Sequence, residues 1–166
     1  MIPTGGAEPG DRVILTKAAG IEGTAILASD FGDEFEIDDD LRERAEAFLE
    51  DLSIVPDARV VREYATAMHD PTEGGVVAGL RELARASDVR LEVDRDAVPV
   101  REETRRLCEA ADVDPLQIFG SGALLAAVPA DASRTVSQIS QTPGSQPPIS
   151  ASRRLAGRTC YSRASH

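Results

Sequence analysis

The residues best placed to do chemistry lie in a glycine-containing stretch that begins at Met68 and ends at Gly75. Within it, Asp70 and Thr72 precede Gly74 and Gly75, and an apolar periodic segment follows. Glycines at the junction of a strand and a helix leave backbone N–H groups accessible to an anion, and the helix dipole favours a phosphate there. The stretch is therefore a candidate phosphate site.

A second glycine-containing stretch is the turn formed by Gly120, Ser121 and Gly122. It leads directly into the apolar run 123–128, which is typical of a central strand that is buried on both faces. The turn lacks the lysine of a phosphate loop, and the sequence contains no Gly-x-Gly-x-x-Gly fingerprint. A plain structural turn is the alternative interpretation.

The first stretch also has the residues of an ordinary helix start. Asp70 is predicted to be the N-cap, Pro71 suits the first helical position, and Glu73 completes a capping box for a helix over residues 71–87. On local grounds this structural interpretation is favoured over a ligand site. The two glycines favour a ligand site, because each glycine in a helix costs about 1 kcal/mol of stability relative to alanine. We expect some group, backbone or ligand, to come close to them.

The sequence offers no clear nucleophile–base pair and no cluster of metal ligands. Ser121 has no histidine nearby in sequence, and His69 beside Asp70 is typical of a capped or surface histidine. Cys108 falls on the apolar face of a predicted helix, so we expect a buried thiol without reactivity. With Cys160 as the second cysteine, neither a disulfide framework nor a cysteine metal cluster is expected, and no metal site is predicted.

Composition indicates one acidic globular domain. The chain has 166 residues, is 42% hydrophobic and carries a net charge of −11, with all 29 acidic residues at or before Asp131. Such an acidic body repels nucleic acid and anionic membranes, which argues against both as partners. Neither a long apolar run nor a basic, apolar leader is present, and we expect a cytoplasmic protein.

Periodicity predicts an α+β fold, in which a mixed β-sheet is covered by helices. Strands are predicted near residues 12–16, 65–69, 89–94 and 123–128. Helices are predicted over residues 21–28, from the Asp38–Asp40 run to Leu52, around 60–64, over 71–87 and along 100–111. Pro56 is expected to end the second of these helices.

The two ends differ from the predicted 11–142 domain. Residues 1–10 are rich in glycine and proline and are interpreted as a flexible lead-in or a linker remnant. Residues 132–142 are expected to form one more helix with Val136 and Ile139 facing inward, and residues 143–166 a disordered tail. The loss of all carboxylates in this region is also what a shifted reading frame would produce, and that hypothesis stays open.

Four motifs resemble the C-terminal domain of the aminoimidazole ribonucleotide synthetase (PurM-like) superfamily. The resemblance covers residues 10–131 and is greatest to the hydrogenase-maturation branch and to proteins described only as synthetase-related. The superfamily also includes thiamine-monophosphate kinases and selenophosphate synthetases. The motifs are Gly10–Ile14, Gly20–Ala25, Met68–Gly75 and Gly120–Leu125.

The resemblance implies a domain that contributes one wall of an ATP and substrate cleft. The family's N-terminal domain, which carries the aspartates for magnesium and ATP and forms a homodimer, has no counterpart in this sequence and is the implied partner. ATP and Mg²⁺ are expected only with that domain, and no cofactor is expected for this chain alone. The implied cleft residues are Asp70, Thr72, Gly74, Gly75, Gly120, Ser121 and Gly122.

Two departures from the hydrogenase-maturation pattern weaken a transfer of its chemistry. Those proteins end in a cysteine that accepts a carbamoyl group, whereas this chain ends in Ser165 and His166. Glu73 stands where that branch has arginine, which weakens a phosphate role for the turn. The chain is therefore interpreted either as part of an ATP-dependent enzyme that is inactive in isolation, as a non-catalytic fragment, or as a small-molecule or partner-binding module.

Overall fold

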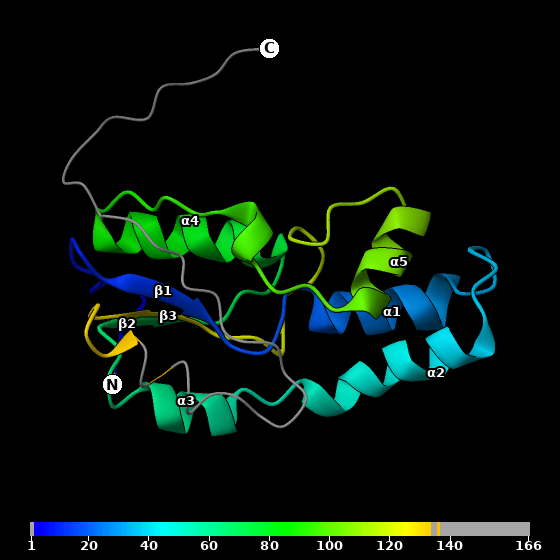
Figure 1. Ribbon diagram of the computed structural model, residues 1–166, viewed down its shortest axis with the longest axis horizontal. Coiled ribbons are helices and arrows are strands. Elements are labelled where there is room, and N and C mark those ends of the chain that lie inside the picture. The colour runs from blue at the N-terminus through cyan, green and yellow to red at the C-terminus, as the bar shows by residue number, and fades with distance from the viewer. Residues whose placement is uncertain (1, 134–135, 137–166) are drawn as a thin grey trace, which may run out of the picture.

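Three strands form one antiparallel sheet in the computed structural model, which describes residues 2–133 and 136 (Figure 1). The strands lie in the order β1-β3-β2. They are β1 Arg12–Leu15, β2 Ala67–His69 and β3 Leu125–Val128. The central strand β3 pairs antiparallel with both neighbours. It is buried along its whole length, as its continuous apolar sequence predicted.

Helices cover both faces of the sheet and form a separate group at one end. Figure 1 shows α4 over one face, α3 under the other, and α1, α2 and α5 packed together beyond the strands. The helices are α1 Ile21–Phe31, α2 Asp39–Glu46, η1 Ala47–Asp51, α3 Val55–Val61, α4 Gly75–Ser87, η2 Arg95–Ala97 and α5 Glu102–Ala110. Over the described part of the chain, no helix is both long and apolar enough to cross a membrane.

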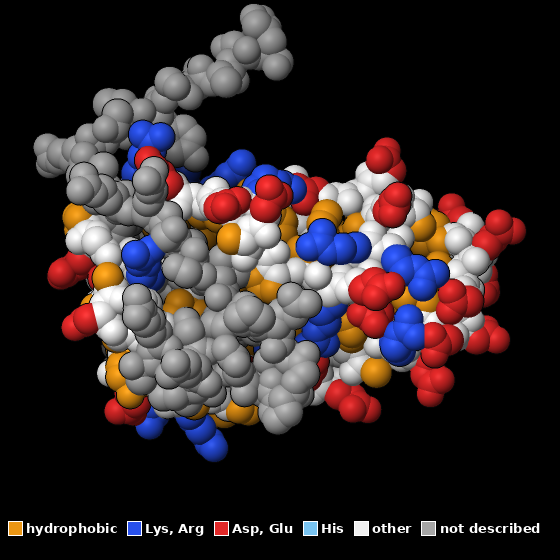
Figure 2. Space-filling model, viewed as in Figure 1, with side chains coloured by type: hydrophobic (Ala, Val, Ile, Leu, Met, Phe, Trp, Pro, Cys, Tyr) orange, Lys and Arg blue, Asp and Glu red, His pale blue; other side chains and the backbone are white. Residues whose placement is uncertain are grey.

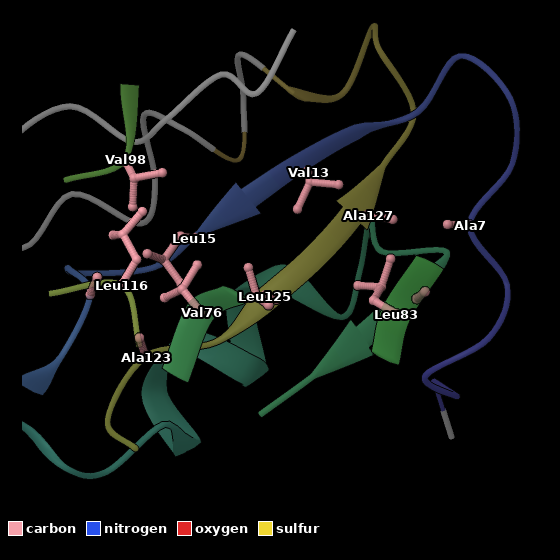
Figure 3. Packing of buried hydrophobic residues seen from close by; sticks show 12 residues of the cluster. Ala7, Val13, Leu15, Val76, Leu83, Val98, Leu116, Ala123, Leu125 and Ala127 are labelled. Atoms are coloured by element: carbon pink, nitrogen blue, oxygen red, sulfur yellow. The ribbon is translucent and has the colours of Figure 1, made fainter. Parts of the chain in front are cut away.

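The main hydrophobic core lies between α4 and the sheet. Leu83 and Val76 of α4 are buried against side chains of β1 and β3, among them Leu15 and Leu125 (Figure 3). A second cluster on the opposite face joins Ile14 to α3 and to other buried residues, which are Val61, Ala65, Ala126, Val128 and Val136. Successive strand residues point to opposite faces of a sheet. Val13 and Leu15 of β1 therefore face the main core, and Ile14 faces the second cluster.

The α+β class is confirmed, while two details of the predicted sheet are wrong. The sheet of the described residues pairs its strands antiparallel only, where we expected a mixed sheet. The strand predicted near 89–94 does not form; within that segment Val89 alone makes an isolated bridge. Val89, Leu91 and Val93 pack on the main core from an irregular segment. The alternating pattern therefore reflects one-sided burial and not strand pairing.

The start of α2 agrees with the prediction, whereas its end does not. The Asp38 carboxylate accepts a hydrogen bond of 2.7 Å from the backbone N–H of Leu41. This bond, with help from Arg106, holds the pKa of Asp38 below its ordinary value. The α-helix stops at Glu46 and continues as a 3-10 turn, and Pro56 lies in the first turn of α3 instead of ending the preceding helix.

Residues 2–10 lie against the body of the domain. The backbone N–H groups of Gly6 and Ala7 both donate to the Ser87 hydroxyl over 3.2 Å, and Ala7 is buried. Of the predicted 132–142 helix, Ser133 and Val136 are helical and Val136 is buried. Ile139 and the predicted tail from residue 143 lie outside the described residues.

Candidate functional site

Gly75 lies closer to a neighbouring backbone than any side chain would allow. A Cβ atom at this position would be 2.4 Å from the carbonyl oxygen of Ile118 and 2.6 Å from that of Leu116. Its φ is +62°, a backbone conformation that glycine adopts without strain. The close approach that the two glycines predicted is therefore real, and the group that comes close is the backbone of the 116–118 loop.

The carbonyl oxygen of Thr72 joins the two predicted glycine turns. It accepts hydrogen bonds from the N–H of Gly75 over 3.1 Å and from the N–H of Gly120 over 3.0 Å. A Cβ atom on Gly120 would lie 3.0 Å from the Pro71 carbonyl oxygen and 3.2 Å from the Gly75 Cα. The two stretches, 45 residues apart from Gly75 to Gly120, thus form one structure.

A third glycine turn, at the start of α1, completes this structure. The N–H of Glu22 donates to the Ser121 carbonyl over 3.3 Å, and the N–H of Gly23 donates to the Phe119 carbonyl over 3.1 Å. The Ile118 side chain packs against Gly20 and Gly23, leaving no room for a Cβ at either. We call residues 20–23, 70–75 and 118–122 together the glycine-turn cluster. Sequence reasoning did not place the first of these segments at the site, although Gly20 before the helix and Gly23 in its first turn were a usable signal.

The predicted site residues divide into an outer and an inner set. Asp70, Thr72 and Gly74 are exposed and Ser121 is half-buried, whereas the other three are buried, namely Gly75, Gly120 and Gly122. The buried glycines hold the turns together, and the outer residues face solvent.

The predicted capping box at Asp70 and Glu73 is wrong. The helix begins four residues later than expected, at Gly75, and its N-cap Gly74 has a left-handed φ of 74° with no side-chain cap bond. Two consecutive residues at positive φ cannot continue an α-helix toward Pro71. Residues 72–75 instead form a turn, closed by the hydrogen bond from the Gly75 N–H to the Thr72 carbonyl.

Electrostatics around Asp70 are unfavourable to its ionised form. Although Asp70 is exposed as a residue, desolvation by nearby atoms raises the pKa of its carboxyl group, and the negative charge of Glu22 raises it further. His69 opposes these effects. The His69 Nε2 atom itself lies 2.7 Å from a carboxylate oxygen of Glu82 on α4, so the imidazole has a partner on the neighbouring helix.

Four backbone amides of the cluster are occupied by hydrogen bonds within it. The amides of Glu22, Gly23 and Gly120 donate to carbonyl groups of a neighbouring turn, and that of Gly75 donates to the Thr72 carbonyl of its own turn. An amide that already donates cannot also hold a phosphate oxygen, and the carboxylates of Asp70, Glu22 and Glu73 repel one. The cluster by itself is therefore a poor fit for a triphosphate.

The described residues show no assembled metal site. Glu22 influences Asp70 through its negative charge, and the described residues contain no group of three or more His, Cys, Asp or Glu side chains that could hold a metal ion.

The 114–118 loop that contacts Gly75 is anchored by one carboxylate. Asp114 accepts hydrogen bonds from the Arg95 guanidinium over 2.9 Å, from the Gln117 side chain over 2.8 Å and from the backbone N–H of Leu116 over 3.0 Å. These bonds, that of Arg95 above all, lower the pKa of Asp114 to about 2. The loop that supports the glycine-turn cluster thus has a charged anchor.

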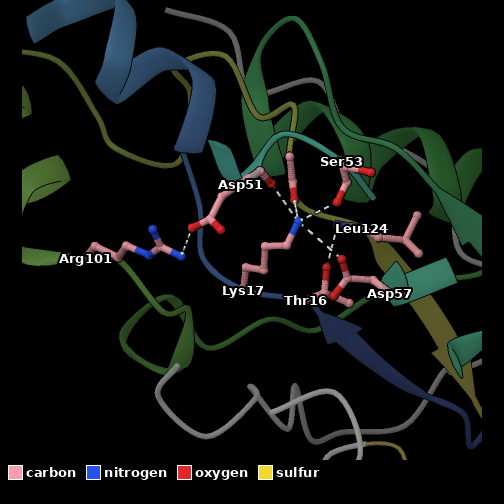
Figure 4. A network of polar contacts seen from close by, with 8 residues as sticks. Thr16, Lys17, Asp51, Ser53, Asp57, Arg101 and Leu124 are labelled. Atoms are coloured by element: carbon pink, nitrogen blue, oxygen red, sulfur yellow. Dashed lines mark hydrogen bonds and ion pairs between the residues drawn. The ribbon is translucent and has the colours of Figure 1, made fainter. Parts of the chain in front are cut away.

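Lys17, which sequence reasoning did not assign to the site, lies behind the cluster. It lies two residues after the end of β1, and its Nζ atom donates to the carbonyl of Gly122 over 2.7 Å (Figure 4). Next to it, Thr16 extends the β1–β3 pairing, because it exchanges hydrogen bonds with the backbone of Leu124. The signal available in the sequence was that Lys17 is the only lysine of the chain.

The Cys108 thiol is buried among the helices at one end of the molecule. Cys108 is buried on α5 as predicted, and desolvation raises the pKa of its thiol to about 11. A thiol with this pKa is protonated near neutral pH and is a poor nucleophile. Figure 2 shows carboxylates and arginines interspersed over the α1, α2 and α5 end of the molecule.

Comparisons with known proteins identify the neighbours of this fold. The family model described as "AIR synthase related protein, C-terminal domain" matches residues 8–147. The "Carbamoyl dehydratase HypE" of Azotobacter vinelandii is 37% identical over 127 residues, which are 75% of this chain and 35% of that protein. The chain therefore spans about a third of this relative's length.

Solved structures agree with the match. The crystal structure of E. coli HypE, a hydrogenase maturation protein, is 25% identical with a TM-score of 0.68, over 83% of this chain and 41% of that one. The crystal structure of a hydrogenase maturation protein HypE in complex with ATP is 26% identical with a TM-score of 0.62, over 84% and 40% of the two chains. The resemblance read from the glycine motifs is thus confirmed.

Proposed function

Because the chain belongs to the family of AIR synthase related C-terminal domains, close to the hydrogenase maturation proteins, we propose that it forms one wall of an ATP and substrate cleft. The other wall would be an N-terminal domain of the kind found in this family. That domain is the proposed partner, and it would also form the homodimer. As part of such a protein, the chain would act in an ATP-dependent synthesis or maturation reaction.

One observation carries this proposal, namely that hydrogen bonds to the carbonyls of Thr72, Phe119 and Ser121 fix three glycine turns distant in sequence to one another. Buried glycines at Gly75 and Gly120 allow this close packing, while Asp70, Thr72 and Gly74 remain exposed. A rigid backbone surface with an exposed polar edge is suited to positioning a ligand. The structure bound to ATP belongs to a relative with 26% identity, which favours a nucleotide as that ligand.

The charges of the cluster indicate a division of labour between the two walls. Asp70, Glu22 and Glu73 are acidic, so the groups that neutralise the phosphates would come from the other domain. A magnesium ion would supply further positive charge to the phosphates when it is bound. We therefore expect the 166-residue chain alone not to hydrolyse ATP.

The proposal is tested by joining this chain to the N-terminal part of the Azotobacter vinelandii relative and titrating ATP with Mg²⁺ by calorimetry. We expect the joined protein to bind ATP and the chain alone not to bind it. Glu73→Arg places a cation beside the turn and should tighten binding several-fold, because arginine pairs well with phosphate. Glu43→Arg makes the same charge change on an exposed position of α2 and should leave binding unchanged.

Several outcomes would contradict the proposal. Equal binding by wild type and the Glu73→Arg variant would mean that this turn does not face the phosphates. Failure of the joined protein to bind ATP would favour a non-catalytic domain with purely structural glycines. Binding of a metabolite by the chain alone, without ATP, would favour a small-molecule module.

A further inference from the structure

Lys17, which has no role in the proposed function, has an unusual backbone conformation and a largely buried side chain. Its φ is 53°, in the left-handed region that residues with side chains rarely adopt. Its side chain is 13% exposed. The side chain extends from two residues beyond β1 to a point where the 51–57 segment meets Gly122 (Figure 4). A strained backbone is retained where surrounding contacts hold it in place.

Four oxygen atoms surround the Nζ atom of Lys17. It donates hydrogen bonds to the carbonyls of Asp51, Ser53 and Gly122 over 2.7, 2.9 and 2.7 Å. An ammonium group has three N–H donors, so these three bonds use all of them. The fourth oxygen is Oδ2 of Asp57 at 3.2 Å, which receives no hydrogen bond from the described residues. The buried Asp57 carboxylate therefore balances the charge without competing for a donor.

This arrangement is the oxygen cage of a monovalent cation, with the cation tethered to the chain. Carbonyl oxygens gathered around a single positive charge are the means by which proteins hold potassium ions. Only a charged group with several donors satisfies all these oxygens together. A neutral side chain of the same length would leave carbonyl groups without a donor in a largely buried place.

We propose that Lys17 is the positioning residue of the Gly120–Gly122 turn, acting as a tethered monovalent cation that fixes the Gly122 carbonyl. The other side of the turn is held by the bond from the Glu22 N–H to the Ser121 carbonyl. Lys17 therefore fixes the turn where the chain enters β3. This inference rests on the proposed function only for the turn's role in ligand binding, since the positioning is measured without any ligand.

The test is chemical rescue of Lys17→Ala in the 166-residue chain, followed by amide hydrogen exchange. The N–H groups of Glu22 and Ala123 donate to carbonyls of the turn, so they report its order. In Lys17→Ala they should exchange at least about tenfold faster relative to the amides of β3, the order expected when a hydrogen bond to a charged group is lost. Added n-propylammonium replaces the missing atoms and should restore slow exchange. Tetramethylammonium at the same concentration has the charge without N–H donors and should not.

Two further variants separate positioning from general stability. Arg101→Ala removes an ion pair of 2.7 Å to the Asp51 carboxylate in the same network and a cation–π contact with Phe48, whereas Arg101 makes no hydrogen bond to the turn among the described residues. It should lower the thermal midpoint while leaving the relative exchange of Glu22 and Ala123 unchanged. Lys17→Arg keeps a charged donor and should leave the turn closer to wild type than Lys17→Met does.

The proposal is overturned if Lys17→Ala accelerates exchange uniformly along the chain or leaves the turn unchanged. Equal rescue by both ammonium compounds would also overturn it, because hydrogen-bond donation would then be irrelevant. If Lys17→Ala does not fold in buffer, recovery of folding by n-propylammonium alone supports the proposal, and failure of that recovery overturns it. None of these outcomes depends on whether ATP binds.

Discussion

Side-chain packing holds the sheet core together, whereas backbone contacts hold the glycine-turn cluster together. In the core, buried side chains such as Leu83, Leu125 and Val76 fill the space between α4 and the strands. In the cluster, backbone meets backbone, and Gly75 and Gly120 are needed because a side chain would not fit. The comparison shows that large side chains stabilise one region, whereas their absence shapes the other.

The largest expected effect lies in the core. Leu125→Ala removes a buried side chain from the central strand and should lower the free energy of unfolding by about 3 kcal/mol. Denaturant unfolding monitored by circular dichroism measures the change. Leu49→Ala is the control, since Leu49 is 53% exposed and should change stability by less than about 0.5 kcal/mol. Equal losses in both variants would mean that burial does not distinguish these leucines.

A smaller but more specific effect is expected in the cluster. Gly75→Ala places a methyl group against two carbonyl oxygens and should cost about 2 kcal/mol of folding stability, measured by denaturant unfolding. Gly10→Ala is the matched control, because Gly10 also has positive φ, +104°, but has no atom within 4 Å of its Cβ position. A loss at Gly75 that does not exceed the loss at Gly10 would show that backbone strain, and not close approach, selects glycine here.

We expect the Asp114 anchor of the 114–118 loop to make folding stability depend on pH in the acid range. Because the folded state lowers the pKa of Asp114 from 3.8 to about 2, its ionised form stabilises the fold above about pH 4, and this contribution is lost as the pH falls toward 2. Solvent screening limits it to about 1 kcal/mol. Unfolding of wild type and Asp114→Asn at pH 2 to 6 should give curves that converge at the acid end. Parallel curves would contradict the assignment.

The smallest effect is expected at the exposed edge of the cluster. Asp70 has a raised pKa and makes no cap bond, so Asp70→Asn should change stability at pH 7 by less than about 0.5 kcal/mol, with a slight gain. A gain is expected because the folded state raises the pKa of Asp70, so that its ionised form slightly destabilises the fold at a pH above that pKa. A thermal-unfolding comparison with Asp131→Asn tests it, and a loss near 1 kcal/mol would restore the N-cap interpretation.

The sequence predicted the core better than the cluster for a physical reason. Apolar periodicity reports burial, so β1, β3, α5 and the inward direction of Cys108 were predictable from side chains. The same signal was misleading at 89–94, where side chains are buried on one side without strand pairing. Burial alone does not specify a hydrogen-bonding partner.

Contacts of the cluster could not be predicted from local patterns. Glycine motifs indicated that something approaches Gly75, but the partner loop is 116–118, far away in sequence. The capping-box pattern at Asp70 and Glu73 was overridden because the glycines adopt left-handed φ to meet that loop. The role of Lys17 could not be predicted because a single lysine is part of no periodic pattern. Its three hydrogen-bond acceptors are backbone carbonyls, which the residue types do not reveal.

Amide hydrogen exchange of the joined two-domain protein, with and without ATP and Mg²⁺, tests most directly whether the glycine-turn cluster is one wall of the nucleotide cleft. We predict that ATP slows exchange at residues 70–75 and 120–122, while the amides of the β1–β3 ladder and of α2 keep their rates. Protection that appears only in the N-terminal domain, with exchange in both turns unchanged, would contradict this account of the cluster.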